Sequence, residues 1–250
     1  MEPSPSSRRP RARRCFFYAE VLLYGQSLPR YLTPLSPSTA RSAVCRLLRW
    51  ICAALLGLVL PSGAAPSTTN PADSLAGQYL HLRALKDSLL RHDPNSPLPV
   101  QVRASFTGLS YFAPDPHFRL IGELSLYGRR QQISVPTTNQ GQALPMERFG
   151  RLQVHCQGKA FWLEVYRSLE NGDLEVFFKD ATNNLQTYGG GRYVPVVGLG
   201  KGQYLIDFNM SYNPYCAYNS TYVCPLPPPQ NRLPIPIPAG EQVYGADLAH

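Results

Sequence analysis

The sequence lacks the residue patterns that carry most enzyme and metal chemistry. Its five histidines include no pair at metal-ligand spacing, and it contains no Cys-x-x-Cys, which argues against a zinc site. It also has no Gly-x-Ser-x-Gly elbow, no Gly-Lys-Ser/Thr phosphate loop and no Gly-x-Gly-x-x-Gly run. The sequence therefore predicts no metal and no cofactor, and it excludes an α/β-hydrolase.

The chain also lacks an apolar run long enough to cross a membrane. The run at 51–60 has ten apolar residues, whereas a spanning helix needs about 20. It follows Arg46 and Arg49 and precedes the small residues at 62–65, and these are the three parts of a secretory signal peptide. We predict a signal peptide at 44–65, and export to the periplasm or the extracellular medium. Membrane contact is expected only through the uncleaved signal segment.

Net positive charge is scarce outside the first 49 residues. That segment holds nine Arg and two Glu, while the rest of the chain holds 15 basic and 14 acidic residues. Of the net charge of +8, +7 therefore belongs to a leader, and no nucleic-acid partner is predicted for the folded part. Residues 1–43 are rich in Arg, Ser and Pro and are expected to be disordered. Either translation starts near Val44, or the chain has a genuine long leader that resembles an organelle transit peptide.

Cysteine becomes rare once the signal peptide is removed, because only Cys156, Cys216 and Cys224 remain. Cys216 and Cys224 are separated by a short segment that Pro214 and Pro225 bend at its ends. In an oxidising compartment we predict a disulfide between these two residues. Cys156 is expected to be buried in a strand, as free cysteines usually are.

Periodicity divides the remaining chain into one helix and several short strands. Ser74 can cap a helix over 75–92, in which leucines recur at spacings of three to five, and Pro94 ends it. From Pro99 onward the apolar residues alternate with period two. The expected strands are Phe118–Tyr127, Gln131–Pro136, Gly150–Gln157, Lys159–Tyr166, Leu174–Lys179, Arg192–Val197 and Gln203–Asp207. We predict a mainly β fold, a β-sandwich or an open barrel, with one N-terminal amphipathic helix packed on it. A linker at 66–73 would lead into a single domain at 74–246.

Polar, glycine and aromatic residues crowd into the last third, at 177–193 and 204–241. These segments follow strand ends, where rigid scaffolds hold functional side chains. The residues that we expect to bind a ligand are Lys179, Asp180, Arg192, Tyr193, Asp207, Asn209, Asn231 and Glu241.

Each of these groups also has a purely structural interpretation. Asp180 and Asp207 could form an acid/base pair, or each could cap its own loop. The glycines at 189–191 could bring backbone N–H groups close to an anion that Arg192 binds, or Arg192 could pair with one of the two aspartates. An internal Arg–Asp bridge is the favoured outcome.

The order of motifs in this block resembles one known family. KDATNNLQTYGGGRY, DFNMSYNPYCAY and CPLPPPQNRLPIPIPAGE are similar to the bacterial and archaeal domain of unknown function family 1684. The resemblance extends upstream through HDPNSPLP, FTGLSYFAPDPHFRL, GRLQV and WLEVYRS, and so covers nearly all of the exported part. It implies no activity, cofactor or substrate, because the family has none assigned.

Three functions remain open from the sequence. The leading hypothesis is an exported domain that binds a small polar or anionic ligand in a pocket of C-terminal loops, with Arg192 as the anion contact. The second is a hydrolase or lyase that uses Asp180 and Asp207 as acid and base. The third is a structural motif without a ligand, whose polar residues satisfy loop backbone.

Overall fold

The structure is a computed structural model that describes residues 74–245. The predicted leader at 1–43, signal peptide at 44–65 and linker at 66–73 lie outside the described residues. Within residues 74–245, no helix is both long enough and apolar enough to cross a membrane.

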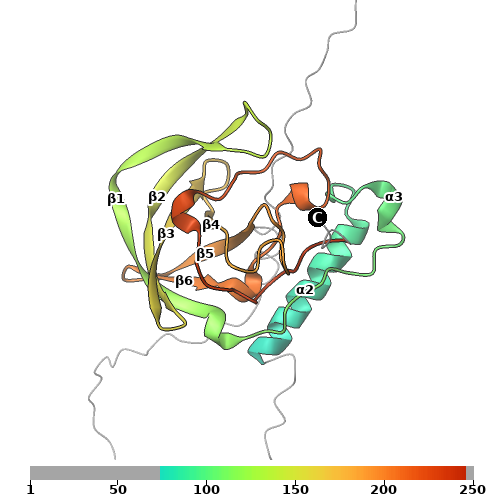
Figure 1. Ribbon diagram of the computed structural model, residues 1–250, viewed down its shortest axis with the longest axis horizontal. Coiled ribbons are helices and arrows are strands. Elements are labelled where there is room, and N and C mark those ends of the chain that lie inside the picture. Colours follow the sequence, from blue (N-terminus) through green and yellow to red (C-terminus); the bar gives the residue numbers. More distant parts are fainter. Residues whose placement is uncertain (1–73, 246–250) are drawn as a thin grey trace, which may run out of the picture.

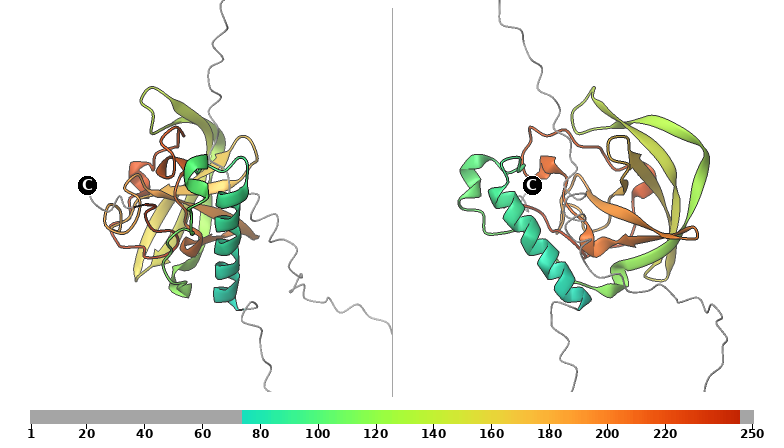
Figure 2. Two further views of the ribbon diagram at one scale, coloured as in Figure 1. Left: turned by 90° about the vertical axis from the view of Figure 1, so that its right-hand side faces the viewer. Right: turned by 180° about the vertical axis from the view of Figure 1, so that it is seen from behind.

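The N-terminal helix α2 spans Leu75–His92, as predicted. Ser74 is its N-cap and accepts a hydrogen bond of 3.0 Å from the backbone N–H of Gly77. The helix buries Tyr79, Lys86 and Leu90 rather than an unbroken row of leucines. A short helix α3 (Val100–Arg103) follows, and α2 packs along one side of the sheet (Figure 2).

Six antiparallel strands form a closed barrel in chain order (Figure 1). They are β1 (Arg119–Pro136), β2 (Ala143–Cys156), β3 (Lys159–Ser168), β4 (Leu174–Phe178), β5 (Arg192–Gly200) and β6 (Gln203–Asp207). The predicted mainly β class with one N-terminal helix is confirmed. The sheet closes because β1 pairs with β6, from Arg119 opposite Asp207 to Glu123 opposite Gln203.

The first strand is longer than the sequence pattern indicates. The two strands expected at 118–127 and 131–136 are one strand, with a register shift between Leu126 and Gln131 where it pairs with β2. Gly128 lies in this irregularity, and a glycine at such a position is equally typical of a turn. A bulge of this kind bends a strand without ending it.

Two apolar clusters lie on opposite sides of the barrel wall. Val176 and Val194 point into the barrel, whereas their neighbours Phe177 and Tyr193 belong to the outer cluster. All six strands contribute to the inner cluster, which is mostly aliphatic. The outer cluster is rich in tyrosine and includes Leu90 of α2. The space between barrel and helix is therefore a second core.

Residues 233–241, which we call the strap, complete the inner core. Leu233, Ile235 and Ile237 are buried in it, while Pro234 and Pro236 between them are exposed. Proline has no N–H to satisfy, so alternation with proline suits a segment that makes few ladder hydrogen bonds. The strap then runs on towards α2 (Figure 1).

Candidate functional site

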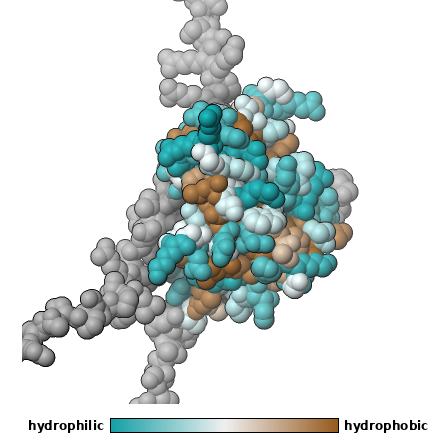
Figure 3. All heavy atoms as spheres, turned by 90° about the vertical axis from the view of Figure 1, so that its left-hand side faces the viewer, coloured by the Kyte–Doolittle hydropathy of each residue, from teal (hydrophilic) through white to brown (hydrophobic). Residues whose placement is uncertain are grey.

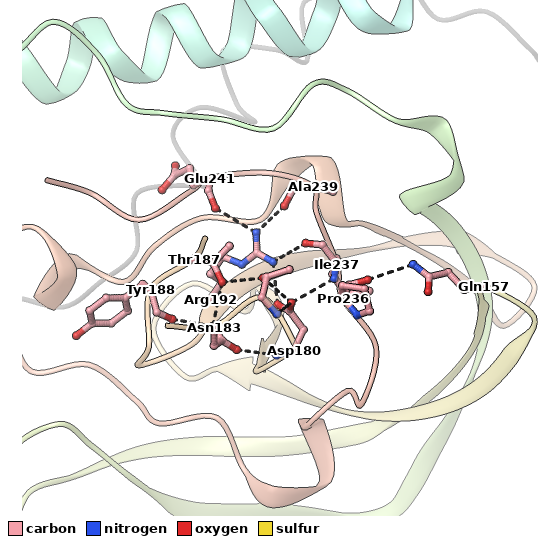
Figure 4. Close-up of polar contacts among 11 residues, drawn as sticks. Gln157, Asp180, Asn183, Thr187, Tyr188, Arg192, Pro236, Ile237, Ala239 and Glu241 are labelled. Carbon is pink, nitrogen blue, oxygen red and sulfur yellow. Dashed lines mark hydrogen bonds and ion pairs between the residues drawn. The ribbon is translucent and has the colours of Figure 1, made fainter. Parts of the chain in front are cut away.

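Arg192 lies at the start of β5 and is completely buried. Its Nη2 donates to Oδ2 of Asp180 at 2.9 Å and to the carbonyl oxygen of Ile237 at 2.8 Å. Its Nη1 donates to the carbonyl oxygens of Ala239 at 2.6 Å and Glu241 at 3.1 Å (Figure 4). The guanidinium thus ties the strap to the end of the barrel.

The Asp180 carboxylate completes this clamp from the other side. Its Oδ1 accepts hydrogen bonds from the backbone N–H groups of Thr182 at 2.8 Å and Ile237 at 3.2 Å. Burial lowers the pKa of Arg192, and the charge of Asp180 opposes that shift. The favoured expectation of an internal Arg–Asp bridge is confirmed. A ligand could reach the guanidinium only after the strap had moved away.

The glycine run before Arg192 is packed against its neighbours. A Cβ at Gly189 would lie 1.9 Å from Oδ1 of Asn184, and one at Gly191 would lie 2.5 Å from Pro227. Gly191 also has a φ of +101°, which favours glycine. These glycines therefore allow the loop to pack closely against its neighbours.

Asn231 and Lys179 hold the strap and its approach to the barrel. Asn231 accepts from the backbone N–H of Glu164 at 2.7 Å and donates to the carbonyl oxygens of Glu164 and Phe177, each at 2.9 Å. The direct pairing of β3 with β4 ends at Tyr166 opposite Glu175. Asn231 links the two strands beyond that point. Lys179 donates to the carbonyl oxygen of Gly189 at 2.7 Å.

Asp207 and Asn209 form a separate group at the end of β6. Asp207 accepts from the hydroxyl of Tyr79 at 2.5 Å, and from the backbone N–H of Asn209 at 3.1 Å. The Asn209 amide in turn accepts from the N–H of Asp115 and donates to its carbonyl oxygen, each at 2.8 Å. Burial raises the pKa of Tyr79 well above its usual range. This group connects α2, the segment before β1, and β6.

Glu241 joins the strap to α2. It forms a buried ion pair with Lys86, and its Oε2 accepts from the hydroxyl of Tyr218 at 2.6 Å and from the N–H of Asn213 at 2.8 Å. Lys86 also lies over the ring of Tyr212, 5.0 Å from its centroid. The sequence pattern did not predict this buried ion pair, because the helical spacing places Lys86 among charges that would face solvent.

The predicted site residues are therefore brought to one region but not into one cavity. Asp180 bonds to Arg192, while Asp207 bonds to Tyr79 and Asn209, and the two carboxylates share no hydrogen-bond partner among the described residues. Tyr193 is buried in the outer cluster and donates to the carbonyl oxygen of Pro225 at 2.5 Å. The geometry gives no support to an acid/base pair, and it favours structural roles for these groups.

A small pocket lies beside this network, between α2 and the strap. Its polar lining comprises Arg83, Lys86, Tyr111, Asn209, Ser211 and Glu241. The enclosed part has room for little more than a water molecule. Arg83 donates to the carbonyl oxygen of Phe112 at 2.8 Å and lies 4.7 Å over the ring of Tyr111.

Ser211 is the notable residue of this pocket. Its side chain is buried, and its hydroxyl has no hydrogen-bond partner among residues 74–245. Gly240, with a φ of +79°, brings the strap close to it, because a Cβ there would lie 2.5 Å from the carbonyl oxygen of Ser211. Sequence reasoning missed Ser211 and Arg83. The only available signal for Ser211 was its place inside the polar block.

Cys216 and Cys224 lie next to each other. The backbone N–H of Cys216 donates to Sγ of Cys224 at 3.3 Å, and the contact with Cys224 raises the pKa of the Cys216 thiol. This disfavours Cys216 as a nucleophile, because the thiolate is the reactive form. The disulfide between them stays a prediction. Cys156 is buried in the inner cluster, as expected.

Glu175 is a buried acid that the sequence pattern did not single out. Tyr212 donates to its Oε1, whereas its Oε2 is buried without a hydrogen-bond partner. Burial raises the pKa of Glu175 to about 7. Among the described residues, His, Cys, Asp and Glu form no group of three or more that could hold a metal ion.

Comparison with known proteins places the chain among uncharacterised relatives. A family model described as protein of unknown function (DUF1684) matches residues 104–242. The chain is also similar to an uncharacterised protein of Haloarcula marismortui with a solution NMR structure, at 33% sequence identity and a TM-score of 0.55. That similarity covers 70% of this chain and 95% of the other. No curated protein matches the chain.

Proposed function

The chain belongs to the DUF1684 family, and on that premise we propose that it is a binding domain for a small polar or anionic ligand. We assign the ligand to the pocket between α2 and the strap. The observation that carries the proposal is that Ser211 lines this pocket, and its buried hydroxyl has no hydrogen-bond partner among the described residues. Buried polar groups are nearly always satisfied, so an orphan group at a pocket wall calls for a water or a ligand.

The charges around the pocket favour a ligand that carries acceptor oxygens. Lys86 forms an ion pair with Glu241, and Arg83 is a second positively charged residue in the lining. A carboxylate or similar oxyanion could accept from the Ser211 hydroxyl and lie within the field of Arg83. Because the enclosed space is small, only such a terminal group of a larger ligand would enter it.

A thermal-shift titration with potassium formate, acetate and phosphate, at matched ionic strength, tests the proposal. We expect at least one of these anions to raise the melting temperature of the wild-type protein. Ser211→Val fills the pocket and removes the hydroxyl, so it should abolish that shift. Arg129→Gln, an exposed charge on β1, serves as the control and should respond like the wild type. Equal shifts for the wild type and Ser211→Val would contradict the proposal.

Export of the protein is part of the same proposal. The support is the three-part pattern at 44–65, a positive flank, a short apolar run and small residues. N-terminal sequencing of the secreted product should find the first residue directly after Ala64 or Ala65. An intact 44–65 segment in the cytoplasmic fraction would argue against export.

A further inference from the structure

The outer wall of the barrel carries an apolar row across three neighbouring strands. Ile121 of β1 lies opposite Leu205 of β6, which in turn lies opposite Val197 of β5. Residues directly opposite each other point to the same face of a sheet. Ile121 is 57% exposed and Val197 is 41% exposed.

This row lies on the solvent side of the wall and contributes nothing to the barrel core. The adjacent residues Leu120, Val196 and Ile206 point inward and pack in the inner cluster. Apolar residues also appear as patches between hydrophilic ones on the side of the molecule seen in Figure 3. Exposed single apolar residues are common, but a paired row on a rigid sheet is a preformed contact surface.

Charged residues of opposite sign stand on either side of the row. Along β1, the sequence around Ile121 places Arg119 two residues before it and Glu123 two residues after it, both on the same outer face and both exposed. Arg119 lies 3.5 Å from Asp207, yet its side chain remains 37% exposed. Glu123 lies opposite Gln203 and Gln153, which are uncharged. The order along the strand is positive, apolar, negative.

That order is complementary to itself under a two-fold rotation. If two copies face each other across an axis that runs along the row, Ile121 meets Ile121 and Val197 meets Val197. The strands then run in opposite directions, so Arg119 of each copy faces Glu123 of the other. We propose that this wall is the interface of a homodimer with two-fold symmetry. A C2 interface requires such a self-complementary patch.

The partner that binds this wall is a second copy of the chain. An unrelated partner would not require the wall to carry opposite charges on the two sides of the apolar row. The row is short and the barrel wall is curved, which places the interface among the small ones. Interfaces below about 1,200 Å² of buried surface are typically weak and transient. The dimer should therefore appear only at high protein concentration.

Sedimentation equilibrium of the full chain, over roughly 10 to 1,000 µM, tests the proposal at concentrations suited to weak, transient interfaces. We expect a monomer–dimer equilibrium in the wild type. Ile121→Lys should weaken it by at least about tenfold, because it buries a charge within the apolar row of the interface. Leu185→Lys alters a residue that is 69% exposed but lies in a loop away from the wall, and should leave the equilibrium unchanged.

Charge reversal tests the two-fold arrangement itself. Arg119→Glu and Glu123→Arg should each prevent self-association, because like charges then face each other on both sides of the row. An equimolar mixture of these two variants should associate, because the opposite charges face each other again. Circular dichroism melting of each variant alone establishes that it is folded.

Three results would overturn the proposal. The first is a wild type that stays monomeric over the whole concentration range. The second is association that survives Ile121→Lys. The third is a mixture of the two folded charge variants that remains monomeric although the wild type dimerises.

Discussion

The inside of the barrel and the layer between the barrel and α2 are built by different chemistry. The inner cluster is apolar and is closed at one end by Arg192 and Asp180. The outer layer is lined with tyrosines and contains the charged groups Lys86, Glu175 and Glu241. Side-chain atoms that are buried without a hydrogen-bond partner among residues 74–245 include Oε2 of Glu175 and the hydroxyl of Ser211 in the outer layer, and Nε of Arg192 in the clamp.

This difference teaches where a functional site can arise in such a fold. The barrel interior is apolar and is packed with strap residues such as Leu233, Ile235 and Ile237, so its lining offers few groups to a polar ligand. The outer layer is held by specific hydrogen bonds, and any group that these bonds leave over is available for a ligand or for water. The pocket at Ser211 lies in that second region.

The largest expected effect comes from breaking the clamp at the end of the barrel. Arg192→Met leaves Asp180 buried without its counterion and frees the carbonyl groups of the strap, including that of Ile237. Removing one partner of a buried ion pair typically costs about 3–5 kcal/mol. Urea unfolding should show a loss of that size, while Arg129→Met, at an exposed position, should change stability little. A loss comparable to that of the control would mean that the clamp does not hold the strap.

Glu175 should make the outer layer sensitive to pH. Its pKa in the folded protein, about 7, lies above its ordinary value of 4.5. The protonated carboxyl therefore contributes stability that is complete below pH 4.5 and is lost as the pH rises through 7. By linkage, that loss is about 3 kcal/mol at most.

Glu175→Gln removes this titration and keeps the neutral shape. Unfolding experiments at pH 5 and pH 8 should show that the variant gains on the wild type as the pH rises. Because the wild type and the variant share all other titrating groups, the difference between them isolates Glu175. If the stability difference between wild type and variant is the same at both pH values, Glu175 is not the group that titrates in this range.

The predicted disulfide should have a smaller effect on the same layer. A bridge between Cys216 and Cys224 closes a short loop, and chain-entropy estimates give roughly 2.5 kcal/mol for a loop of that size. Thiol counting on the denatured, oxidised mature protein, from which residues 1–65 have been removed, should find Cys156 as the one reactive thiol. Reduction should lower the melting temperature of the wild type and leave that of Cys216→Ser unchanged. Three reactive thiols under oxidising conditions would exclude the bridge.

The smallest effect on stability is expected at Ser211. Its hydroxyl has no hydrogen-bond partner, so Ser211→Ala removes no internal bond. Thermal unfolding should show a change within about 0.5 kcal/mol, or a slight gain, because an unsatisfied polar group is lost. A matched change, Thr182→Ala, removes a hydroxyl that donates to Asp180 at 2.5 Å and should cost more. A large loss for Ser211→Ala would reveal a partner for the hydroxyl.

Local features of the fold could be predicted from the sequence because their determinants are close together in the chain. The helix follows from the cap at Ser74 and the break near Pro94. The β2–β3 hairpin follows from its two-residue turn, in which Gln157 and Gly158 have φ values of 51° and 72°. The bend of β1 could not be predicted, because a glycine such as Gly128 is as typical of a turn as of a bulge within one strand.

The candidate site could be located but not interpreted, because its partners are far apart in the chain. Lys86 looks like a solvent-exposed helix charge until Glu241, 155 positions later, is placed beside it. Asn231 was recognised as a special residue, but its bonds to the backbone of β3 and β4 depend on where those strands separate. The polar side chains in the loops suggested a ligand, whereas the contacts show that most of them form hydrogen bonds with backbone groups.

The most direct test of this account is hydrogen–deuterium exchange of the strap amides. The N–H groups of Leu233, Ile237 and Glu241 donate to the carbonyl of Lys179, the carboxylate of Asp180 and the carbonyl of Ser211. If the strap is a clamped part of the core, these amides should exchange as slowly as those in the middle of β3 and β5. Exchange at the rate of exposed loops would contradict the account, because the strap would then open and expose Arg192 to a ligand.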